Sequence, residues 1–199
     1  MPAMKRLVSA LVLVTTACAG DDGAPADTEA EGSSADVDDD DGNDMSESSS
    51  STGEPVNDPI GAAALHNVVR ANAQPLPDPP LPEMMWSDEL AEIATNYAAN
   101  CVWEHSMVDG LGENLYASTG QMDIGPAVEA WADEVTMYDY ATNTCSGVCG
   151  HYTQIVWRES VNVGCGYADC PMITGLPWGG RLWVCNYTPP GNYVGEKPY

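Results

Sequence analysis

Residues 147–160 read GVCGHYTQIVWRES, a short stretch that contains a cysteine, a histidine and two large aromatic side chains. From His151 to Trp157 the residues alternate with a period of two, which predicts a β-strand. One face of this strand would carry His151, Thr153, Ile155 and Trp157, so the imidazole would point into a layer of the domain. A buried imidazole needs a polar partner, and His151 is therefore the first candidate functional residue.

Two later segments show the same period. Residues 162–170 (NVGCGYADC) and 181–187 (RLWVCNY) alternate in the same way, and their short connections predict antiparallel strands. Apolar residues at helical spacing precede these segments, at residues 59–75, from Ser87 onward and at residues 123–138. Helices combined with a mainly antiparallel sheet predict an α+β layered domain.

Each predicted helix has one face for burial. The residues expected on the buried face of the first helix are Leu65, Val68, Val69 and Asn72. Ser87 fits the N-cap of the second helix. The buried face of this helix is expected to carry Leu90, Ile93, Ala94, Tyr97, Ala98 and Cys101, and also His105 if the helix extends that far. The third helix has Asp123 as a possible cap and Pro126 in its first turn. Its buried face is expected to carry the apolar residues Val128, Trp131, Val135 and Tyr138, and Glu134 lies at the margin of this face.

The composition divides the chain into a polar tail and one domain. Of the 30 Asp and Glu residues, 14 lie in residues 19–58, a stretch without Lys or Arg. This stretch buries too little apolar surface to offset its ordering entropy, so we predict a disordered acidic linker. Its run DVDDDDGND could instead form a calcium site, but it lacks the ordered ligand spacing of a calcium loop. Residues 59–199 hold every Trp and Tyr and six of the seven Cys, enough for one domain with its own core.

The first 18 residues have the layout of a secretory signal. A basic pair at positions 5 and 6 precedes a short apolar run and then small residues, and the run is too short to span a membrane. Two cleavage patterns compete, because TAC at residues 16–18 resembles a lipoprotein signal, whereas ACA at residues 17–19 suits an ordinary signal peptidase. Lipidation of Cys18 would leave an even six Cys for an oxidising compartment. We therefore expect export, with the protein anchored at the outer membrane through Cys18 or released outside the cell.

Five segments of the domain resemble the signature segments of the CAP superfamily, which contains cysteine-rich secretory, antigen 5 and pathogenesis-related proteins and whose domain is also called SCP. In chain order these segments are CVWEHS (101–106), GENLY (112–116), YDYATNTCSGVCG (138–150), GHYTQIVWRESVNVGCG (150–166) and VCNYTPPGNYVGEKPY (184–199). The resemblance spans residues 61–199 and is strongest to the plant pathogenesis-related class. It implies a three-layer α-β-α sandwich, in agreement with the layered domain expected from the periods.

The resemblance also implies a cleft lined by two histidines and two glutamates. In this sequence they are His105, Glu113, Glu134 and His151. Imidazole nitrogen and carboxylate oxygen are both accepted zinc ligands, so the four side chains are expected to bind Zn²⁺ or another divalent metal. The alternative is a hydrogen-bonded cluster that holds the walls of the cleft together without a metal.

Further expectations concern residues outside this cleft. The resemblance implies disulfides between Cys101 and Cys170, between Cys165 and Cys185 and between Cys145 and Cys149. It implies that His66 packs inside the domain and forms hydrogen bonds there. Trp178, in GLPWGG, is expected to be a loop aromatic that could contact a ligand.

Several function classes are disfavoured by the sequence. It contains no HExxH, GxSxG, Walker or dinucleotide-binding motif, and Ser106 next to His105 does not indicate a serine hydrolase, since neighbouring side chains diverge. Residues 59–199 carry 16 acidic against four basic residues and would repel nucleic acid. Two classes remain open: a secreted module that binds a lipid, sterol, peptide or surface protein, and a metal-assisted hydrolase that uses the same cleft.

Overall fold

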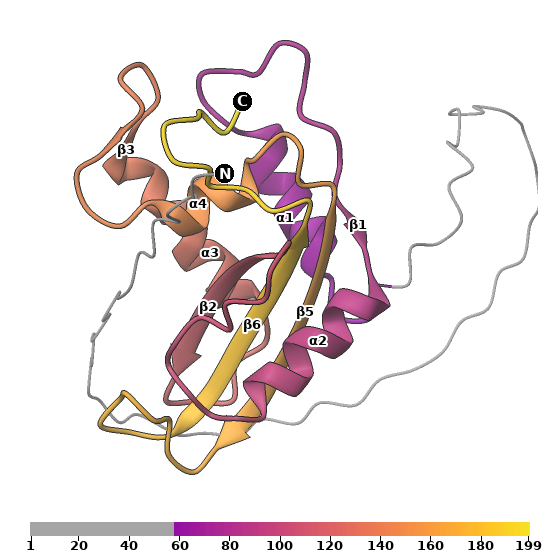
Figure 1. Cartoon of the computed structure of the whole chain (residues 1–199), viewed down its shortest axis with the longest axis vertical. Helices are drawn as coiled ribbons and strands as arrows, with labels where there is room; N and C mark the ends of the chain where they lie inside the picture. Colours follow the sequence, from indigo (N-terminus) through magenta and orange to yellow (C-terminus); the bar gives the residue numbers. More distant parts are fainter. Residues whose placement is uncertain (1–57) are drawn as a thin grey trace, which may run out of the picture. The chain divides into compact units, whose positions relative to one another are not determined.

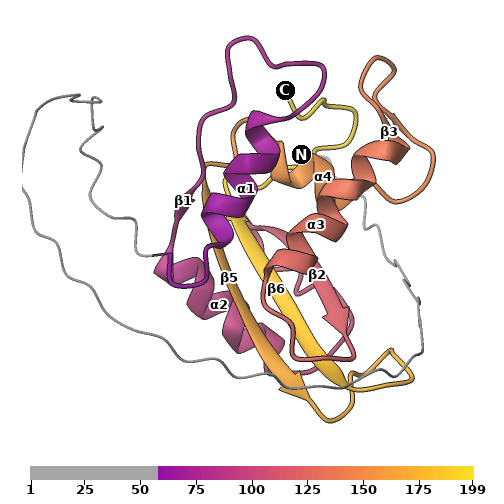
Figure 2. The same cartoon turned by 180° about the vertical axis from the view of Figure 1, so that it is seen from behind.

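The computed structural model of the chain describes residues 58–199. In this part a four-stranded sheet lies between two helical layers, with α2 on one face and α1, α3 and α4 on the other (Figures 1 and 2). The predicted α+β sandwich is therefore confirmed. The elements are, in chain order, α1 (Ala62–Ala71), β1 (Met85–Trp86), α2 (Asp88–Ala98), β2 (Gly112–Ser118), α3 (Gly125–Asp133), the 3₁₀ helix η1 (Glu134–Met137), β3 (Tyr138–Asp139), β4 (Thr144–Cys145), α4 (Gly150–Ile155), β5 (Asn162–Cys170) and β6 (Gly180–Thr188).

The sheet has the strand order β1-β5-β6-β2. β5 and β6 are antiparallel, as predicted, β2 is antiparallel to β6, and only β1 runs parallel to its neighbour β5. Glycines on β5 permit a close approach of α2, because a Cβ atom at Gly164 would lie 2.3 Å from the backbone nitrogen of Ala91 and one at Gly166 would lie 2.0 Å from Oγ1 of Thr95. The sequence NVGCG thus combines a strand with a docking surface for a helix.

The helix α2 follows the sequence prediction closely. The side chain of Ser87 accepts a hydrogen bond from the backbone nitrogen of Leu90, as expected of an N-cap. Leu90, Ala94 and Ala98 are buried against the sheet. The helix ends at Ala98, so His105 lies in the segment between α2 and β2 and not on the helix.

The helix α1 buries a different face from the one predicted. Leu65 and Val68 are 37% and 60% exposed, whereas the polar residues His66 and Arg70 are almost completely buried. Val69 is partly buried against the core, as predicted. For Leu65 and Val68 the prediction was wrong, because the neighbouring polar side chains find partners inside the domain, which makes their burial favourable. Asp58, expected at the end of the linker, accepts hydrogen bonds from the first backbone nitrogens of α1.

The stretch from His151 to Trp157 is not a strand, as its alternation predicted, but contains the short helix α4. All seven of these residues are buried, so the alternation does not mark an inner and an outer face. The two ends of this helix are satisfied by charged side chains from elsewhere in the fold. The carboxylate of Glu134 accepts hydrogen bonds from the backbone nitrogens of His151 and Tyr152, and the guanidinium of Arg70 donates to the carbonyl oxygens of Ile155 and Trp157.

The charges of these two residues match the helix ends on which they lie. A carboxylate is favourable at a helix N-terminus and a cation at a C-terminus, because of the unpaired backbone groups and the helix dipole. A six-residue helix has little stability of its own. Glu134 and Arg70 thus allow this segment to be helical inside the core.

The third predicted helix divides into α3 and η1. Trp131 and Val128 are buried as expected, and the carboxylate of Asp123 accepts a hydrogen bond from the backbone nitrogen of Gly125 at the start of the helix. Val135, expected inside, is 38% exposed, because the chain tightens into η1 and the inward position passes to Glu134, which is 2% exposed.

All three expected disulfides are present. They join Cys101 to Cys170, Cys165 to Cys185 and Cys145 to Cys149. The signal segment, and the linker up to residue 57, lie outside the described residues. Within residues 58–199, no helix has both the length and the apolar character needed to cross a membrane.

Candidate functional site

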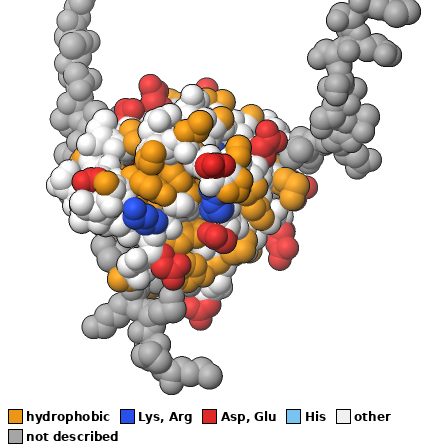
Figure 3. Space-filling view, turned by 90° about the horizontal axis from the view of Figure 1, so that it is seen from above, with side chains coloured by type: hydrophobic (Ala, Val, Ile, Leu, Met, Phe, Trp, Pro, Cys, Tyr) orange, Lys and Arg blue, Asp and Glu red, His pale blue; other side chains and the backbone are white. Residues whose placement is uncertain are grey.

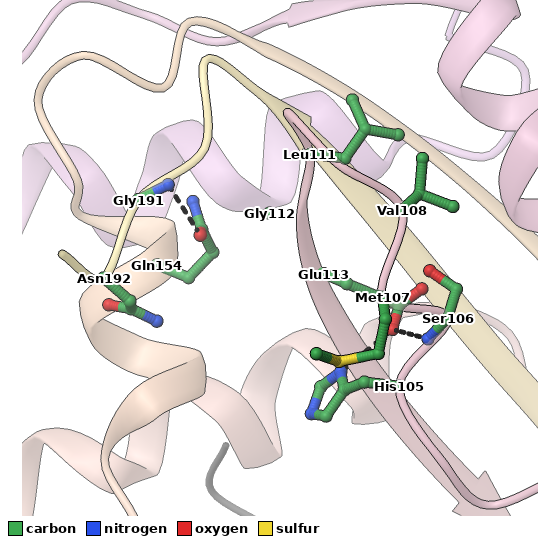
Figure 4. Close-up of a pocket in the computed structure, with 10 residues that line it drawn as sticks. All are labelled: His105, Ser106, Met107, Val108, Leu111, Gly112, Glu113, Gln154, Gly191 and Asn192. Carbon is green, nitrogen blue, oxygen red and sulfur yellow. Dashed lines mark hydrogen bonds and ion pairs between the residues drawn. The ribbon is translucent and has the colours of Figure 1, made fainter. Parts of the chain in front are cut away.

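The four predicted site residues form two histidine–glutamate pairs. In the first pair, Nδ1 of His105 lies 2.9 Å from Oε1 of Glu113, which begins β2 together with Gly112. The same oxygen accepts a hydrogen bond from the backbone nitrogen of Ser106 at 2.8 Å (Figure 4). The hydroxyl of Ser106 bonds to neither histidine, and the described residues thus contain no serine–histidine pair of the hydrolase type at this site.

The second pair is more deeply buried. Nδ1 of His151 lies 2.6 Å from Oε1 of Glu134, and the side chain of Glu134 is 2% exposed. The indole of Trp131 stacks on the imidazole of His151, with ring centroids 6.0 Å apart. The carboxylate that begins η1 therefore both orients this imidazole and satisfies the N-terminus of α4.

Both histidines have the same hydrogen-bonding pattern. Each Nδ1 faces a carboxylate, which can only accept when ionised, so Nδ1 carries the proton and Nε2 holds a lone pair. Among residues 58–199 neither Nε2 atom has a hydrogen-bond partner. This is the arrangement in which metal-ligating histidines are usually held.

The donor set fits a divalent metal only in part. Of the side chains in residues 58–199, no three His, Cys, Asp or Glu lie together as a group able to hold a metal ion. Glu134 has both carboxylate oxygens engaged in hydrogen bonds. The groups available to a metal are the two histidine Nε2 atoms, because Oε2 of Glu113, which has no partner among the described residues, is buried.

A cavity of about 80 Å³ lies against the first pair. His105, Glu113 and most of the residues between them form one wall, and Gln154 and Asn192 lie on the opposite side (Figure 4). Glu134 and His151 do not line this cavity. The structure thus places the two pairs on neighbouring elements, and the first of them lines this cavity.

Comparison with known proteins identifies the fold. Residues 63–187 match the profile described as "CAP: Cysteine-rich secretory protein family". The chain belongs to the CAP family. Peptidase inhibitor 16 of Mus musculus is 45% identical over 140 residues, which are 68% of this chain and 28% of that protein. Pathogenesis-related protein 1A of Nicotiana tabacum is 43% identical over 140 residues, 67% of this chain and 76% of that protein.

A solved structure agrees with this assignment. Venom allergen-like protein 4 of Schistosoma mansoni aligns with a TM-score of 0.55 and 27% identity, covering 69% of this chain and 90% of that one. NaASP2, a CAP relative at 27% identity and a TM-score of 0.49, has been crystallised with Zn²⁺; the alignment covers 69% of this chain and 82% of that one. The chain spans less than a third of the length of the peptidase inhibitor 16 proteins that it matches.

A buried hydrogen-bond chain connects the CAP domain's first helix to its site. Nδ1 of His66 donates to the carbonyl oxygen of Ala62 at 2.7 Å, so Nε2 accepts from the hydroxyl of Tyr187 at 2.8 Å. Nδ2 of Asn114 bonds both to the Tyr187 hydroxyl and to the carbonyl oxygen of His151. His66 is thus a packing and hydrogen-bonding residue, as predicted. Burial lowers its pKa to about 4 and raises the pKa of Tyr187 well above its usual value.

Sequence reasoning missed several residues of the CAP site. Gln154 and Asn192 lie in the signature segments, but nothing in their pattern indicates a cavity, and Met107 lies just outside those segments. Asn192 has a positive φ of 58°, a backbone conformation that asparagine adopts more readily than most residues, and its side chain bonds to α4. Trp178 is partly buried against the cluster that contains Ile173 and Leu182, so its role as a ligand contact remains a prediction.

Proposed function

We propose that this CAP domain is a binding module whose His105 and His151 hold a divalent metal, with Zn²⁺ as the first choice. The observation that carries the proposal is that each Nδ1 is tied to a carboxylate while each Nε2 keeps a lone pair without a partner among residues 58–199. Neutral imidazole nitrogen is a preferred ligand of zinc. The two Nε2 atoms of the chain itself therefore support the proposal.

The two glutamates have different roles in this proposal. Glu134 orients His151 and is otherwise occupied by the backbone of α4, so it acts as a positioning residue. Glu113 orients His105 through Oε1. The metal, when bound, would supply a Lewis-acidic positive charge at the cleft. This charge would favour ligands with carbonyl or carboxylate oxygens, whether they belong to a lipid, a sterol, a peptide or a surface protein.

Metal uptake provides the first test. Calorimetry with chelator-treated protein at neutral pH should show zinc binding, and the double substitution His105→Gln and His151→Gln should abolish it. Since protonated imidazole cannot ligate, the affinity should also fall as the pH is lowered. Replacement of Glu113 by Gln, which removes the carboxylate behind His105, should weaken zinc binding by about 10–100-fold.

The matched control is Glu104→Gln, which removes an exposed carboxylate next to His105 in the sequence but outside both pairs. This variant should bind zinc like the parent protein. Circular dichroism should show that all variants are folded. Absence of zinc uptake at neutral pH, or uptake that survives the double histidine substitution, would show that the two pairs are structural hydrogen-bonded clusters.

We also propose that the chain is exported and anchored by a lipid on Cys18. The basic pair, the apolar run and TAC at residues 16–18 support this proposal, as does the even number of Cys that remains. Because Ala19 and not Asp follows Cys18, the outer membrane is the expected location. Mass spectrometry of the mature N-terminus should find Cys18 with added acyl mass. A soluble mature protein that begins after Cys18 and carries no acyl group would contradict the anchor.

A further inference from the structure

Two buried polar side chains on adjacent strands have atoms that find no hydrogen-bond partner among residues 58–199. These atoms are Nδ2 and Oδ1 of Asn186, on β6, and Oε2 of Glu113, on β2. Asn186 is 1% exposed, and the side chain of Glu113 is 7% exposed. A buried polar atom is unfavourable when it is unpaired, and in folded proteins almost every such atom bonds to a protein group or to an ordered water molecule.

The register of the sheet makes these two side chains neighbours. Glu113 is directly opposite Asn186 in the antiparallel pair of β2 and β6, and Gly164 on β5 is opposite Asn186 on the other side. Residues in such positions point to the same face of the sheet, with Cβ atoms about 4.5–5.5 Å apart. Because Gly164 has no side chain, the polar cross-strand neighbour of the Asn186 amide is the carboxylate of Glu113.

Both side chains lie on the face of the sheet that α2 covers, and Figure 1 shows this helix lying across β5 and β6. A Cβ atom at Gly164 would lie 2.4 Å from the backbone oxygen of Ser87, at the start of the helix. Leu115 and Val184, two positions along the strands on the same face, pack with Ala94 of α2 in one buried cluster. The helix and this cluster therefore separate the amide and the carboxylate from bulk solvent.

Its enclosure distinguishes Glu113 from the acidic residues at the surface. Residues 59–199 carry 16 acidic side chains, and those visible in Figure 3 lie where bulk water hydrates them. Within residues 58–199, Glu113 receives hydrogen bonds at Oε1, from His105 and from the backbone of Ser106. No Lys or Arg of these residues forms an ion pair with it. Its second oxygen therefore still needs a donor.

A nearby hydroxyl is already used. Tyr97 of α2 packs against the same buried cluster, and its pKa is raised by burial and then by the charge of Glu113. The hydroxyl of Tyr97 donates to the carbonyl oxygen of Glu104 at 2.6 Å. The unpaired Nδ2 of Asn186 is thus the donor that this environment offers on the side of Oε2.

We propose that enclosed water bridges Nδ2 of Asn186 and Oε2 of Glu113, so that Asn186 is a positioning residue for the His105–Glu113 pair. Water can accept from Nδ2 and donate to Oε2 and Oδ1, whereas a cation cannot accept from the amide and an anion is repelled by the carboxylate. With both oxygens bonded, the carboxylate is fixed on two sides and holds Nδ1 of His105. The proposal rests on the proposed function only in that His105 is one of the proposed metal ligands, and the bridge itself needs no metal.

NMR of ¹⁵N-labelled protein kept in chelator tests the bridge directly. Water with a long residence time should show cross-relaxation with the Nδ2 protons of Asn186, whose signals are assigned from triple-resonance spectra. Tyr97→Phe should keep this effect, which would show that it does not arise from exchange through the Tyr97 hydroxyl. Absence of cross-relaxation in the folded parent protein would overturn the proposal, and this measurement requires no variant to fold.

The positioning role is tested through His105. In Asn186→Leu an apolar side chain of similar volume replaces the amide, so the water loses its donor. The Nδ1 proton of His105 should then exchange with solvent about tenfold faster or more. Val163→Ala, a buried change on the opposite face of the sheet, is the matched control for lost stability and should leave this exchange rate unchanged. An unchanged rate in Asn186→Leu, or an equal rise in Val163→Ala, would contradict the positioning role.

The chelator separates this test from the test of metal binding. Failure of the bridge would appear as missing cross-relaxation, or as unchanged exchange of the His105 proton, in metal-free protein. Failure of the metal proposal would appear as missing zinc uptake in calorimetry. The two failures can therefore be told apart.

Discussion

Replacement of Arg70 by Ala should lower the free energy of unfolding of this CAP domain by about 3–5 kcal/mol. The side chain is 2% exposed, and its guanidinium donates to the carbonyl oxygens of Ile155 at 2.7 Å, Trp157 at 2.8 Å and Pro82 at 2.9 Å. The substitution leaves these carbonyl groups without their donor and opens a cavity beside α4. Burial lowers the pKa of Arg70 to about 10, so the guanidinium is still protonated at neutral pH and keeps all its donors.

Urea unfolding followed by tryptophan fluorescence measures this loss. Arg158→Ala is the matched control, since Arg158 also donates to backbone carbonyls, those of Pro79 and Pro80, but does so at the surface. Its loss should cost about 1 kcal/mol. Arg70→Lys should be intermediate, because an ammonium keeps the charge but not the planar fork. A loss below about 1 kcal/mol for Arg70→Ala would show that the end of α4 does not depend on this residue.

Acidification should destabilise the domain through His66. The imidazole is fully buried and its pKa is lowered to about 4, mainly by burial, against an ordinary value of 6.5. Above pH 6.5 it is neutral in both states. As the pH falls from there, the unfolded chain binds the proton while the folded domain does not, so stability is lost. By pH 4 this residue alone should have removed about 3 kcal/mol.

The groups that face His66 allow its contribution to be isolated. Tyr187 and the Ala62 carbonyl hold the ring, Arg70 lowers its pKa further, and Asp58 raises it. Free energies of unfolding should be measured for the parent protein and for His66→Gln between pH 7.5 and pH 4, at intervals of about half a pH unit. Asp and Glu side chains are protonated over the same pH range in both proteins, so their contribution largely cancels in the difference between the two free energies of unfolding. The variant should be less stable at neutral pH and lose less stability on acidification; parallel curves would contradict the buried neutral imidazole.

Several features of this protein could be read directly from its sequence. The periods of residues 162–170 and 181–187 predicted the central antiparallel pair, and Ser87 with its following residues predicted the start and the buried face of α2. In α2 and in the last residues of β5 one face meets the core and the other meets solvent, so local patterning reports the environment there. β6 is buried on both faces, and its period identified a strand but not an exposed face. The signature segments further implied the disulfides and the four site residues, and the structure pairs His105 with Glu113 and His151 with Glu134.

Only the tertiary structure decided the conformation around His151. Residues 151–157 are buried on all sides, so their pattern contains no contrast between inside and outside, and strand and helix could not be distinguished by period. The helix forms because Glu134, 17 positions earlier, satisfies its first backbone nitrogens and Arg70, 85 positions before Ile155, satisfies its last carbonyls. In α1, long-range hydrogen bonds of His66 with Tyr187 and of Arg70 with Ile155 likewise accompany the burial of these two polar side chains. Pairing of this kind depends on proximity in space, which local sequence does not encode.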